Sequence, residues 1–364
     1  MHRFQSIHQP TRREMLGTLA ALGAGAFAAR EAARGQAPQR IINVHHHLTA
    51  PAYVKFLQDN KVREFPIKSE DQCLEDMDKA GVSVALCSTI GPGIWFGNMA
   101  DTRRLAREIN EYAAKLVSNH PGRLGMFTML ALPDIDGSLK EIEYGFDALK
   151  ADGVYMYTNW GGKALYGDKY LGDVALTPIY EELNRRNAVI YTHPKDAACC
   201  EGIVPGVPGS TIEYTMDTAR TMVSLLYSGT AAKYPNIRWI FSHGGGALPG
   251  MIGRIASPQA TYLEDGGKLR AGAPPARKTP AMPNGPLFEL QKFYYDTSSA
   301  VNPLGVGALR KMVPLSQIMF GGDFPFVVSA EQVHLLKECR VFSDAELPAI
   351  FAGNAMRLFP KYKV

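Results

Sequence analysis

The sequence has few of the features that define several specialised classes of protein. Its 364 residues include only five cysteines and no CxxC pair, a density too low for a disulfide-stabilised scaffold. We interpret the adjacent Cys199 and Cys200 as small buried residues or one strained pair rather than as metal ligands. Apart from the N-terminal segment, no long apolar run is present and none reaches 18 residues, so we expect no stable membrane insertion.

A strong charge of either sign is also missing. The formal net charge is +4, from 39 Lys and Arg against 35 Asp and Glu. Five arginines and two glutamates within residues 1–37 account for +3 of this, which leaves +1 for the rest of the chain. This balance gives no electrostatic reason to expect nucleic acid as a partner. The hydrophobic content of 46% is ordinary for a folded protein and excludes long disorder or a collagen-like fibre.

The first 37 residues have the pattern of an export leader. Arg12 and Arg13 stand just before an apolar run of small residues from Met15 to Ala29, which at about 15 residues is too short to span a bilayer. Two candidate cleavage sites follow, at Ala26-Phe27-Ala28 and Gly35-Gln36-Ala37. The pattern predicts a twin-arginine signal, a route that carries folded proteins to the periplasm or beyond. The alternative is that the pattern is due to chance and that this segment is a short amphipathic helix at the N-terminus.

Eight short apolar runs alternate with helix-like segments from residue 40 onward. Most runs are continuous, which is typical of strands in a parallel sheet covered on both faces. The predicted strands are Ile41–His45, Val82–Ser88, Arg123–Leu130, Gly153–Thr158, Ala188–His193, Ile237–His243, Phe293–Thr297 and Gln317–Gly321. The predicted helices include Ser69–Ala80 (with Ser69 as its N-cap), Thr102–Asn119, Ser138–Lys150, Pro178–Arg186 and Thr215–Lys233.

This alternation predicts a single (β/α)8 TIM barrel over residues 38–364, preceded by the leader at 1–37. An open doubly wound sheet is less favoured, because no G-x-G-x-x-G follows the first predicted strand. The stretch Asp265–Leu287, rich in Gly, Pro and Lys, is expected to be a surface loop or a short insertion before the seventh strand.

Titratable residues are found where four of the predicted strands end. The residues are His45-His46-His47 on the first strand, His193 on the fifth, His243 on the sixth and Asp323 on the eighth. In a barrel of this type the C-terminal strand ends surround one shared crevice. His45 and His47 are two residues apart, so both imidazoles face the barrel mouth, whereas His46 faces the helices and is expected to pack there.

Three imidazoles and one carboxylate form a suitable ligand set for a divalent cation. We predict that His45, His47, His193 and Asp323 bind one ion, Zn²⁺ by preference and Mn²⁺ as the alternative, with one position open for water or substrate. The fourth strand offers no bridging Lys or Glu, which favours a single ion. His243, followed by three glycines, is predicted to act as a general acid or base, with ligation as the alternative. Asp323 is also a candidate for proton transfer.

Two further assignments stay open at this point. Asp296, at the end of the seventh predicted strand, is either a hydrogen-bond partner of a metal ligand or a cap of the following helix. Trp95, Phe96 and Trp160 are either walls for a planar ligand or ordinary packing residues under long loops.

With these motifs assembled, the chain resembles the amidohydrolase superfamily, in particular its branch that contains aminocarboxymuconate-semialdehyde decarboxylase. The matching motifs are Asn43-Val44-His45-His46-His47, Tyr191-Thr192-His193-Pro194, Phe241-Ser242-His243-Gly244-Gly245-Gly246, Phe320-Gly321-Gly322-Asp323-Phe324-Pro325 and Gly353-Asn354-Ala355. Within that branch the chain is similar to 6-methylsalicylate decarboxylases over Val44–Tyr53, Leu149–Asn159 and Leu183–Pro194. Asn43 is a departure, because the family usually has Asp there; an amide can hydrogen-bond but adds no charge.

The resemblance implies a metal-dependent, non-oxidative decarboxylase of an aromatic or muconate-type carboxylic acid. The ion would clamp the substrate carboxylate and a neighbouring oxygen, while Asp323 or His243 protonates the ring carbon. Two alternatives remain: a hydrolase that attacks a lactone, amide or ester with a metal-bound water, and a non-catalytic metal-binding protein. We expect a small-molecule substrate as partner, and a homodimer, because barrels of this kind often pair.

Overall fold

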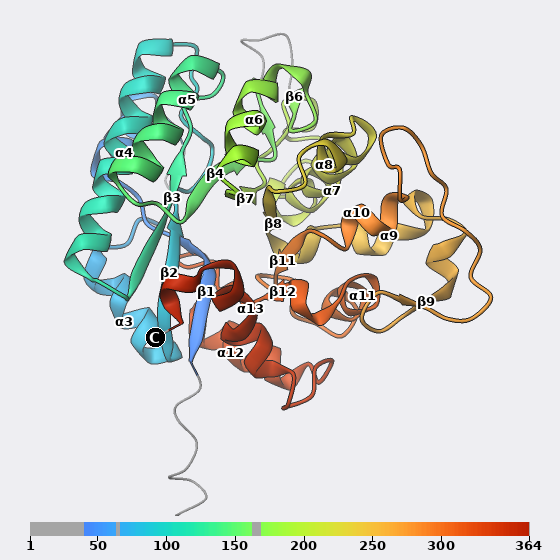
Figure 1. The fold of residues 1–364 in the computed structure, drawn as a ribbon. Helices are drawn as coiled ribbons and strands as arrows, with labels where there is room; N and C mark the ends of the chain where they lie inside the picture. Colours follow the sequence, from blue (N-terminus) through green and yellow to red (C-terminus); the bar gives the residue numbers. More distant parts are fainter. Residues whose placement is uncertain (1–39, 63–65, 162–168, 364) are drawn as a thin grey trace, which may run out of the picture. The chain divides into compact units, whose positions relative to one another are not determined.

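The computed structural model describes residues 40–62, 66–161 and 169–363. Eight parallel strands in this part of the chain form one sheet, in the order β1-β2-β3-β4-β7-β8-β11-β12 (Figure 1). The strands are β1 (Ile41–His47), β2 (Val82–Ser88), β3 (Leu124–Met129), β4 (Gly153–Tyr157), β7 (Val189–His193), β8 (Arg238–Phe241), β11 (Tyr294–Asp296) and β12 (Ile318–Met319). All eight predicted strands are confirmed, with differences only at their ends. The predicted leader lies outside the described residues, so its boundary stays a prediction.

The sheet closes between β1 and the segment that follows β12. The amide of Val44 donates to the carbonyl of Phe320 at 3.0 Å, and the amide of His47 donates to that of Phe324 at 2.9 Å. The amide of Asp323 donates to the carbonyl of His45 at 2.8 Å. These bonds complete the barrel and confirm the predicted (β/α)8 architecture.

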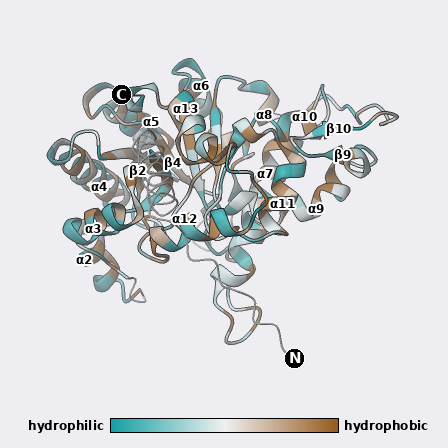
Figure 2. Ribbon diagram, turned by 90° about the horizontal axis from the view of Figure 1, so that it is seen from below, coloured by the Kyte–Doolittle hydropathy of each residue, from teal (hydrophilic) through white to brown (hydrophobic). Residues whose placement is uncertain are grey.

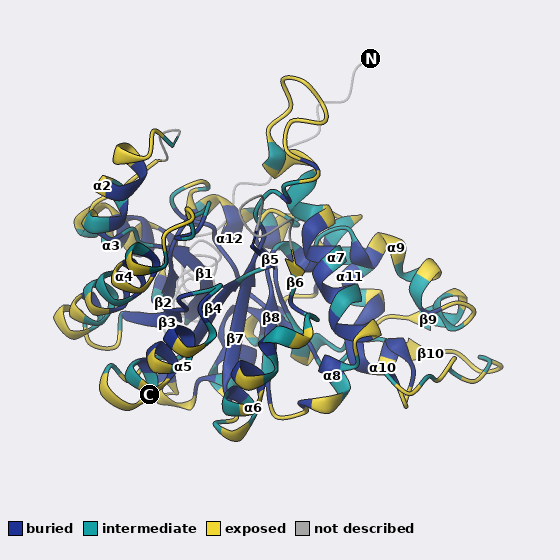
Figure 3. Ribbon diagram, turned by 90° about the horizontal axis from the view of Figure 1, so that it is seen from above, coloured by how far each residue is buried: buried dark blue, intermediate teal, exposed yellow. Residues whose placement is uncertain are grey.

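Helices surround the strands, and Figure 3 shows the strands buried inside a more exposed outer ring. The longer helices are α2 (Pro51–Asp59), α3 (Glu70–Ala80), α4 (Met99–Asn119), α5 (Ile135–Glu143), α6 (Thr177–Arg185), α7 (Glu213–Tyr227), α9 (Leu248–Ile255), α11 (Gly305–Met312) and α12 (Ser329–Glu338). The short ones are α8 (Thr230–Lys233), α10 (Pro286–Leu290) and α13 (Asn354–Leu358). Hydrophilic and hydrophobic stretches alternate along them (Figure 2), as expected for helices with one face on a barrel.

Local sequence explains where several helices begin and end. Ser69 accepts a hydrogen bond from the amide of Gln72, whose side chain in turn accepts from the amide of Ser69, so α3 begins with the predicted N-cap. The predicted helix Thr215–Lys233 is instead divided into α7 and α8, because Gly229 between them has a positive φ of 80°. None of the described helices is long and apolar enough to cross a membrane.

Within the described residues, two short antiparallel strand pairs lie outside the barrel sheet. One pairs β5 (Asn159–Trp160) with β6 (Lys169–Tyr170), directly after β4. The other pairs β9 (Leu263–Glu264) with β10 (Lys268–Leu269), near the start of the segment predicted as a surface loop. That segment is otherwise irregular up to α10. Among the described cysteines, Cys200 is buried as predicted, whereas Cys199 is exposed, so burial was wrong for that residue; both are free thiols.

Candidate metal centre and active site

Four predicted ligands converge at the C-terminal mouth of the barrel. The Nε2 atoms of His45 and His47 lie 3.1 Å apart, and Oδ1 of Asp323 lies 3.2 and 3.4 Å from them. With His193 included, one ligand atom from each residue falls within 4.8 Å of all the others. Nitrogen and oxygen atoms that share one ion at about 2.1 Å lie about 3.0 to 3.4 Å from each other. His45, His47 and Asp323 therefore have the spacing of a ligand set, and His193 lies close enough to join it; these four residues are here called the metal centre.

Hydrogen bonds to Nδ1 orient all three imidazoles of the metal centre. The partners are Oδ2 of Asp296 at 3.0 Å from His45, Oγ of Ser88 at 3.0 Å from His47, and the carbonyl of Pro194 at 2.8 Å from His193. Carboxylate and carbonyl oxygens only accept, so Nδ1 carries a proton in His45 and His193. The Nε2 atoms are then directed toward the cluster, which is the arrangement that metal-binding histidines adopt.

The electrostatics of the metal centre also suit a cation. Burial disfavours the imidazolium form and lowers the pKa of His47, and that of His193 well below its usual range, so both are neutral donors. Burial acts the same way on His45, but the carboxylates of Asp296 and Asp323 outweigh it and raise its pKa to about 10. Oδ1 of Asp323 is buried without a hydrogen-bond partner. A cation among these ligands would give that oxygen its partner and balance the two carboxylates.

His243 lies beside the metal centre and outside the four-residue cluster. Its ring centre is 4.9 Å from that of His45 and 5.4 Å from that of His193. Nδ1 lies 3.2 Å from the carbonyl oxygen of Ser298, so Nδ1 carries the proton and Nε2 has a lone pair. Burial and the neighbouring His45 lower the pKa of His243, which keeps it neutral near pH 7. This position suits proton transfer better than ligation.

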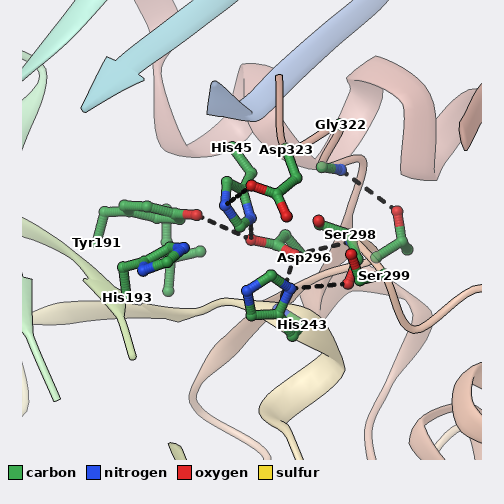
Figure 4. Close-up of polar contacts among 12 residues, drawn as sticks. His45, Tyr191, His193, His243, Asp296, Ser298, Ser299, Gly322 and Asp323 are labelled. Carbon is green, nitrogen blue, oxygen red and sulfur yellow. Dashed lines mark hydrogen bonds and ion pairs between the residues drawn. The ribbon is translucent and has the colours of Figure 1, made fainter. Parts of the chain in front are cut away.

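Asp296 connects the metal centre to His243 (Figure 4). Its Oδ2 accepts from Nδ1 of His45 and from the hydroxyl of Tyr191 at 3.2 Å. Its Oδ1 accepts from the amide of His243 at 3.0 Å and from the amide of Ser298 at 2.9 Å. The first of the two open interpretations therefore holds, since the next described helix, α11, begins only at Gly305.

The side chain of Asn43 lies at the closure of the barrel and bonds to groups on both sides of it. Its Oδ1 accepts from the amide of His45 at 3.0 Å and from the amide of Gly322 at 2.9 Å, across the closure of the barrel. Its Nδ2 donates to Nδ1 of His46 at 3.3 Å. His46 points away from the metal centre, as predicted: Nε2 contacts Sγ of Cys73 at 3.0 Å, and its ring stacks on Phe324.

Backbone geometry adds information that the sequence patterns did not reveal. His243 and Asp323 have positive φ angles of 54° and 65°, a region that few residues other than glycine adopt. Gly246 also has a positive φ, of 61°, and a Cβ atom there would collide with the carbonyl oxygen of Thr215. The glycines after His243 thus allow this tight turn, and both predicted proton-transfer residues lie on strained backbone.

Aromatic residues around the mouth divide into three cases. Trp95 and Trp160 line one cavity together with Tyr155 and Tyr157, which fits the predicted walls. Phe96 does not line it and packs instead against Phe56, with ring centres 5.0 Å apart. Sequence reasoning missed Phe326, whose partly exposed ring lies 6.0 Å from that of His47. Its only signal was its place three residues after Asp323.

Comparisons with known proteins identify several relatives of this chain. A decarboxylase of Aspergillus niger is 32% identical over 343 residues, covering 89% of this chain and 88% of its own. The 6-methylsalicylic acid decarboxylase of Penicillium expansum is 32% identical over 335 residues, covering 88% and 97%. A crystal structure of a dihydroxybenzoic acid decarboxylase from Polaromonas sp. JS666, with bound manganese and an inhibitor, aligns with a TM-score of 0.75 at 19% identity, over 90% of this chain and 98% of that one. The amidohydrolase family model matches residues 42–361, and this chain belongs to that family.

Proposed function

We propose that the protein is a metal-dependent carboxy-lyase that removes CO₂, without an oxidant, from an aromatic or muconate-type carboxylic acid. The observation that carries the proposal is the convergence of His45, His47, His193 and Asp323, with His243 beside them. The proposal is also supported by similarity over most of the chain to relatives that are named as decarboxylases.

We propose one divalent ion as the cofactor. Three imidazoles and one carboxylate favour Zn²⁺, which remains our first expectation, while the Polaromonas relative carries manganese. When bound, the ion supplies Lewis-acid chemistry at the substrate carboxylate and an adjacent oxygen. Elemental analysis of the protein as purified distinguishes the two metals.

Residues of the chain itself would supply the proton. Nδ1 of His243 is fixed on the carbonyl of Ser298, so only Nε2 can take up a proton and deliver it. That proton adds to the ring carbon bearing the carboxylate. The electrons of the breaking C–C bond return to the ring as CO₂ leaves, and aromaticity is restored. Asp323, whose carboxylate lies in the same cluster, is the alternative donor.

The test is to incubate the metal-loaded protein with 6-methylsalicylate, 2,6-dihydroxybenzoate and a benzene dicarboxylate bearing an ortho hydroxyl. We expect one mole of CO₂ per mole of decarboxylated product from at least one of them, and none from the Asp323→Ala variant. A parallel panel of lactones, amides and esters tests the hydrolase alternative. Turnover of that panel without CO₂ release from any acid would overturn the proposal.

We also propose that residues 1–37 direct export by the twin-arginine route and that the mature barrel forms a homodimer. The paired Arg12 and Arg13 before the apolar run support the first. Replacing both arginines by lysine should retain the protein in the cytoplasm of a bacterium that expresses it, as judged by cell fractionation. Sedimentation equilibrium should return twice the mass of one chain, and a monomer mass would contradict the second proposal.

A further inference from the structure

Asn43 is a buried residue of β1 to which the proposed reaction gives no task. It lies two residues before the ligand His45 and is fully buried. Its side chain bonds to its own strand and to the turn after β12, where Asp323 lies. Residues that bond to the surroundings of a metal ligand commonly fix the geometry of that ligand.

The side-chain oxygen of Asn43 joins the backbones of two ligands. Oδ1 accepts from the amide of His45 at 3.0 Å and from the amide of Gly322, directly before Asp323, at 2.9 Å. Backbone amides can only donate, so the atom that faces both must be the oxygen, and this fixes the orientation of the side-chain amide. Asp323 and His45 lie side by side at this point, although they come from opposite sides of the barrel closure (Figure 4). One oxygen therefore ties the two ligands together.

The position of Asp323 depends on this backbone contact. Oδ1 of Asp323 has no hydrogen-bond partner, and the residue has a positive φ of 65°, so the backbone has to hold that oxygen in place. The amide of Gly322 also donates to the carbonyl of His45, but at 3.3 Å, which is longer than its bond to Asn43. A Cβ atom on Gly322 would lie 2.6 Å from Nδ2 of Asn43, so only glycine allows the two to come this close. Without Asn43, the amide of Gly322 would keep the weaker of its two bonds.

The nitrogen of the same side-chain amide is held by His46. Nδ2 of Asn43 donates to Nδ1 of His46 at 3.3 Å, because an amide nitrogen can only donate. An imidazole that accepts at Nδ1 carries its proton on Nε2, which lies 3.0 Å from Sγ of Cys73 on α3. The His46 ring also stacks on Phe324, directly after Asp323, with ring centres 4.7 Å apart. The plane of the Asn43 amide is therefore held through a contact with a helix outside the sheet.

We infer that Asn43 is a positioning residue, whose side-chain amide places Asp323 against His45 and thereby sets the affinity of the metal centre for its ion. The inference rests on the proposed function, because it takes the four-residue cluster to be a metal site. The aspartate that the family usually has at this position could also accept from both backbone amides. It could not donate to His46, so the imidazole would have to carry its proton on Nδ1, and the thiol of Cys73 would have to donate to Nε2.

Competition between the metal-free full chain and a fluorescent chelator, for Zn²⁺ and separately for Mn²⁺, tests the inference without turnover. Asn43→Ala and the similarly sized Asn43→Leu remove both bonds of Oδ1, and we expect the affinity to fall by about 10- to 100-fold, the usual cost of losing a residue that orients a ligand. Asn43→Asp should retain most of the wild-type affinity, because a carboxylate accepts from both amides. This rescue separates positioning from packing, since a buried carboxylate is costlier to fold around than a leucine.

Asn110→Ala is the matched control. Asn110 is also buried, its Oδ1 accepts from the amide of Met129 at 2.7 Å, and its Nδ2 donates to Glu141 at 2.8 Å. These bonds join α4 to β3 and α5, and none of them reaches a metal ligand. Its replacement should lower the free energy of unfolding in urea and leave the metal affinity unchanged.

NMR of the side-chain nitrogens in histidine-labelled, metal-free protein reports the tautomer of His46, with its signal assigned by its loss in His46→Gln. We expect the Nε2–H form in the wild type and the Nδ1–H form in Asn43→Asp. An Nδ1–H form in the wild type overturns the inference. It is also overturned if Asn43→Ala and Asn43→Leu bind as tightly as the wild type, or if folded Asn43→Asp loses the ion. A wild type that binds neither ion would overturn the proposed function as well.

Discussion

The metal centre and the cavity lined by Trp95, Tyr155 and Trp160 differ in how their polar atoms are satisfied. In the metal centre, Nδ1 of each imidazole has a partner at 2.8 to 3.0 Å, and only the atoms that face the common point are left. Around the cavity, by contrast, Trp95, Tyr155 and Trp160 each bury a polar atom that has no hydrogen-bond partner. The imidazoles of the first region are held in place by hydrogen bonds, whereas the second region has polar atoms without such bonds.

This difference separates two tasks. A cation needs ligands held within a few tenths of an ångström, and partners behind each imidazole provide that precision. A substrate that must enter and leave needs groups that it can satisfy only when bound. Substitutions in each region should therefore have different consequences, and the largest should come from the metal centre.

Removing a ligand should have the strongest effect. Asp323→Ala deletes an oxygen that lies 3.2 Å from Nε2 of His45, and we expect loss of the bound metal together with at least about a 10³-fold fall in decarboxylation. Elemental analysis and CO₂ release measure both. The control is Asp265→Ala, which removes an exposed carboxylate near the surface hairpin and should change neither. Full metal content in Asp323→Ala would show that this residue is not a ligand.

Removing the proton-transfer group should affect the reaction alone. His243→Gln should lower kcat by about 10²- to 10⁴-fold, the usual contribution of a general acid or base. The metal content should stay at the wild-type level, because His243 lies outside the four-residue cluster. Loss of the metal in this variant would instead make His243 a ligand and contradict the division of roles.

Weakening the hydrogen bond that orients a metal ligand should have an intermediate effect on metal binding. Asp296→Asn weakens the contact to Nδ1 of His45 and adds an N–H group where only acceptors fit, so metal affinity should fall by about 10- to 100-fold. Competition with a fluorescent chelator measures this affinity. Unchanged affinity, with the fold intact by circular dichroism, would mean that Asp296 does not orient His45.

Two neighbouring tyrosines, one in each region, allow the two regions to be compared by the free energy of unfolding. Tyr191 and Tyr155 are partners in the register between β7 and β4, but only the hydroxyl of Tyr191 has a partner, Asp296. Tyr191→Phe should cost about 1.5 to 3 kcal/mol, because a carboxylate loses a hydrogen bond. Tyr155→Phe should change the free energy of unfolding by less than about 0.5 kcal/mol. Urea denaturation measures both values. Equal losses in the free energy of unfolding would contradict the difference between the two hydroxyl groups.

The barrel could be predicted from the sequence because most of its strands are continuous apolar runs. The titratable residues of the site occur at the C-terminal ends of these runs. The four ligands followed from the same logic, since the C-terminal ends of parallel strands meet. Boundaries were less accurate where local backbone decides them. β12 ends at Met319, before two glycines and the positive φ of Asp323, and the predicted helix from Ser138 begins earlier, at Ile135, and changes to a wider turn after Glu143.

The contacts behind the ligands could not be predicted from the sequence. Ser88 and Tyr191 reach the site only through the register of β1 with β2 and the position of β7 in the sheet, which no local pattern contains. The role of Asn43 depends on barrel closure, because its side chain bonds to an amide on the far side of that closure. For the same reason Asp296 could not be assigned before its neighbours were known.

The closure of the barrel between β1 and the segment after β12 also sets when the protein can acquire its ion. Two of the ligands come from the first strand, and the carboxylate ligand comes from beyond the last one. A chain that has not been synthesised as far as Asp323 holds at most the imidazoles, and a fragment that stops before β12 lacks the fourth donor. The complete set of four donors therefore exists only when the barrel is closed, and we expect tight binding of the ion to require the folded chain.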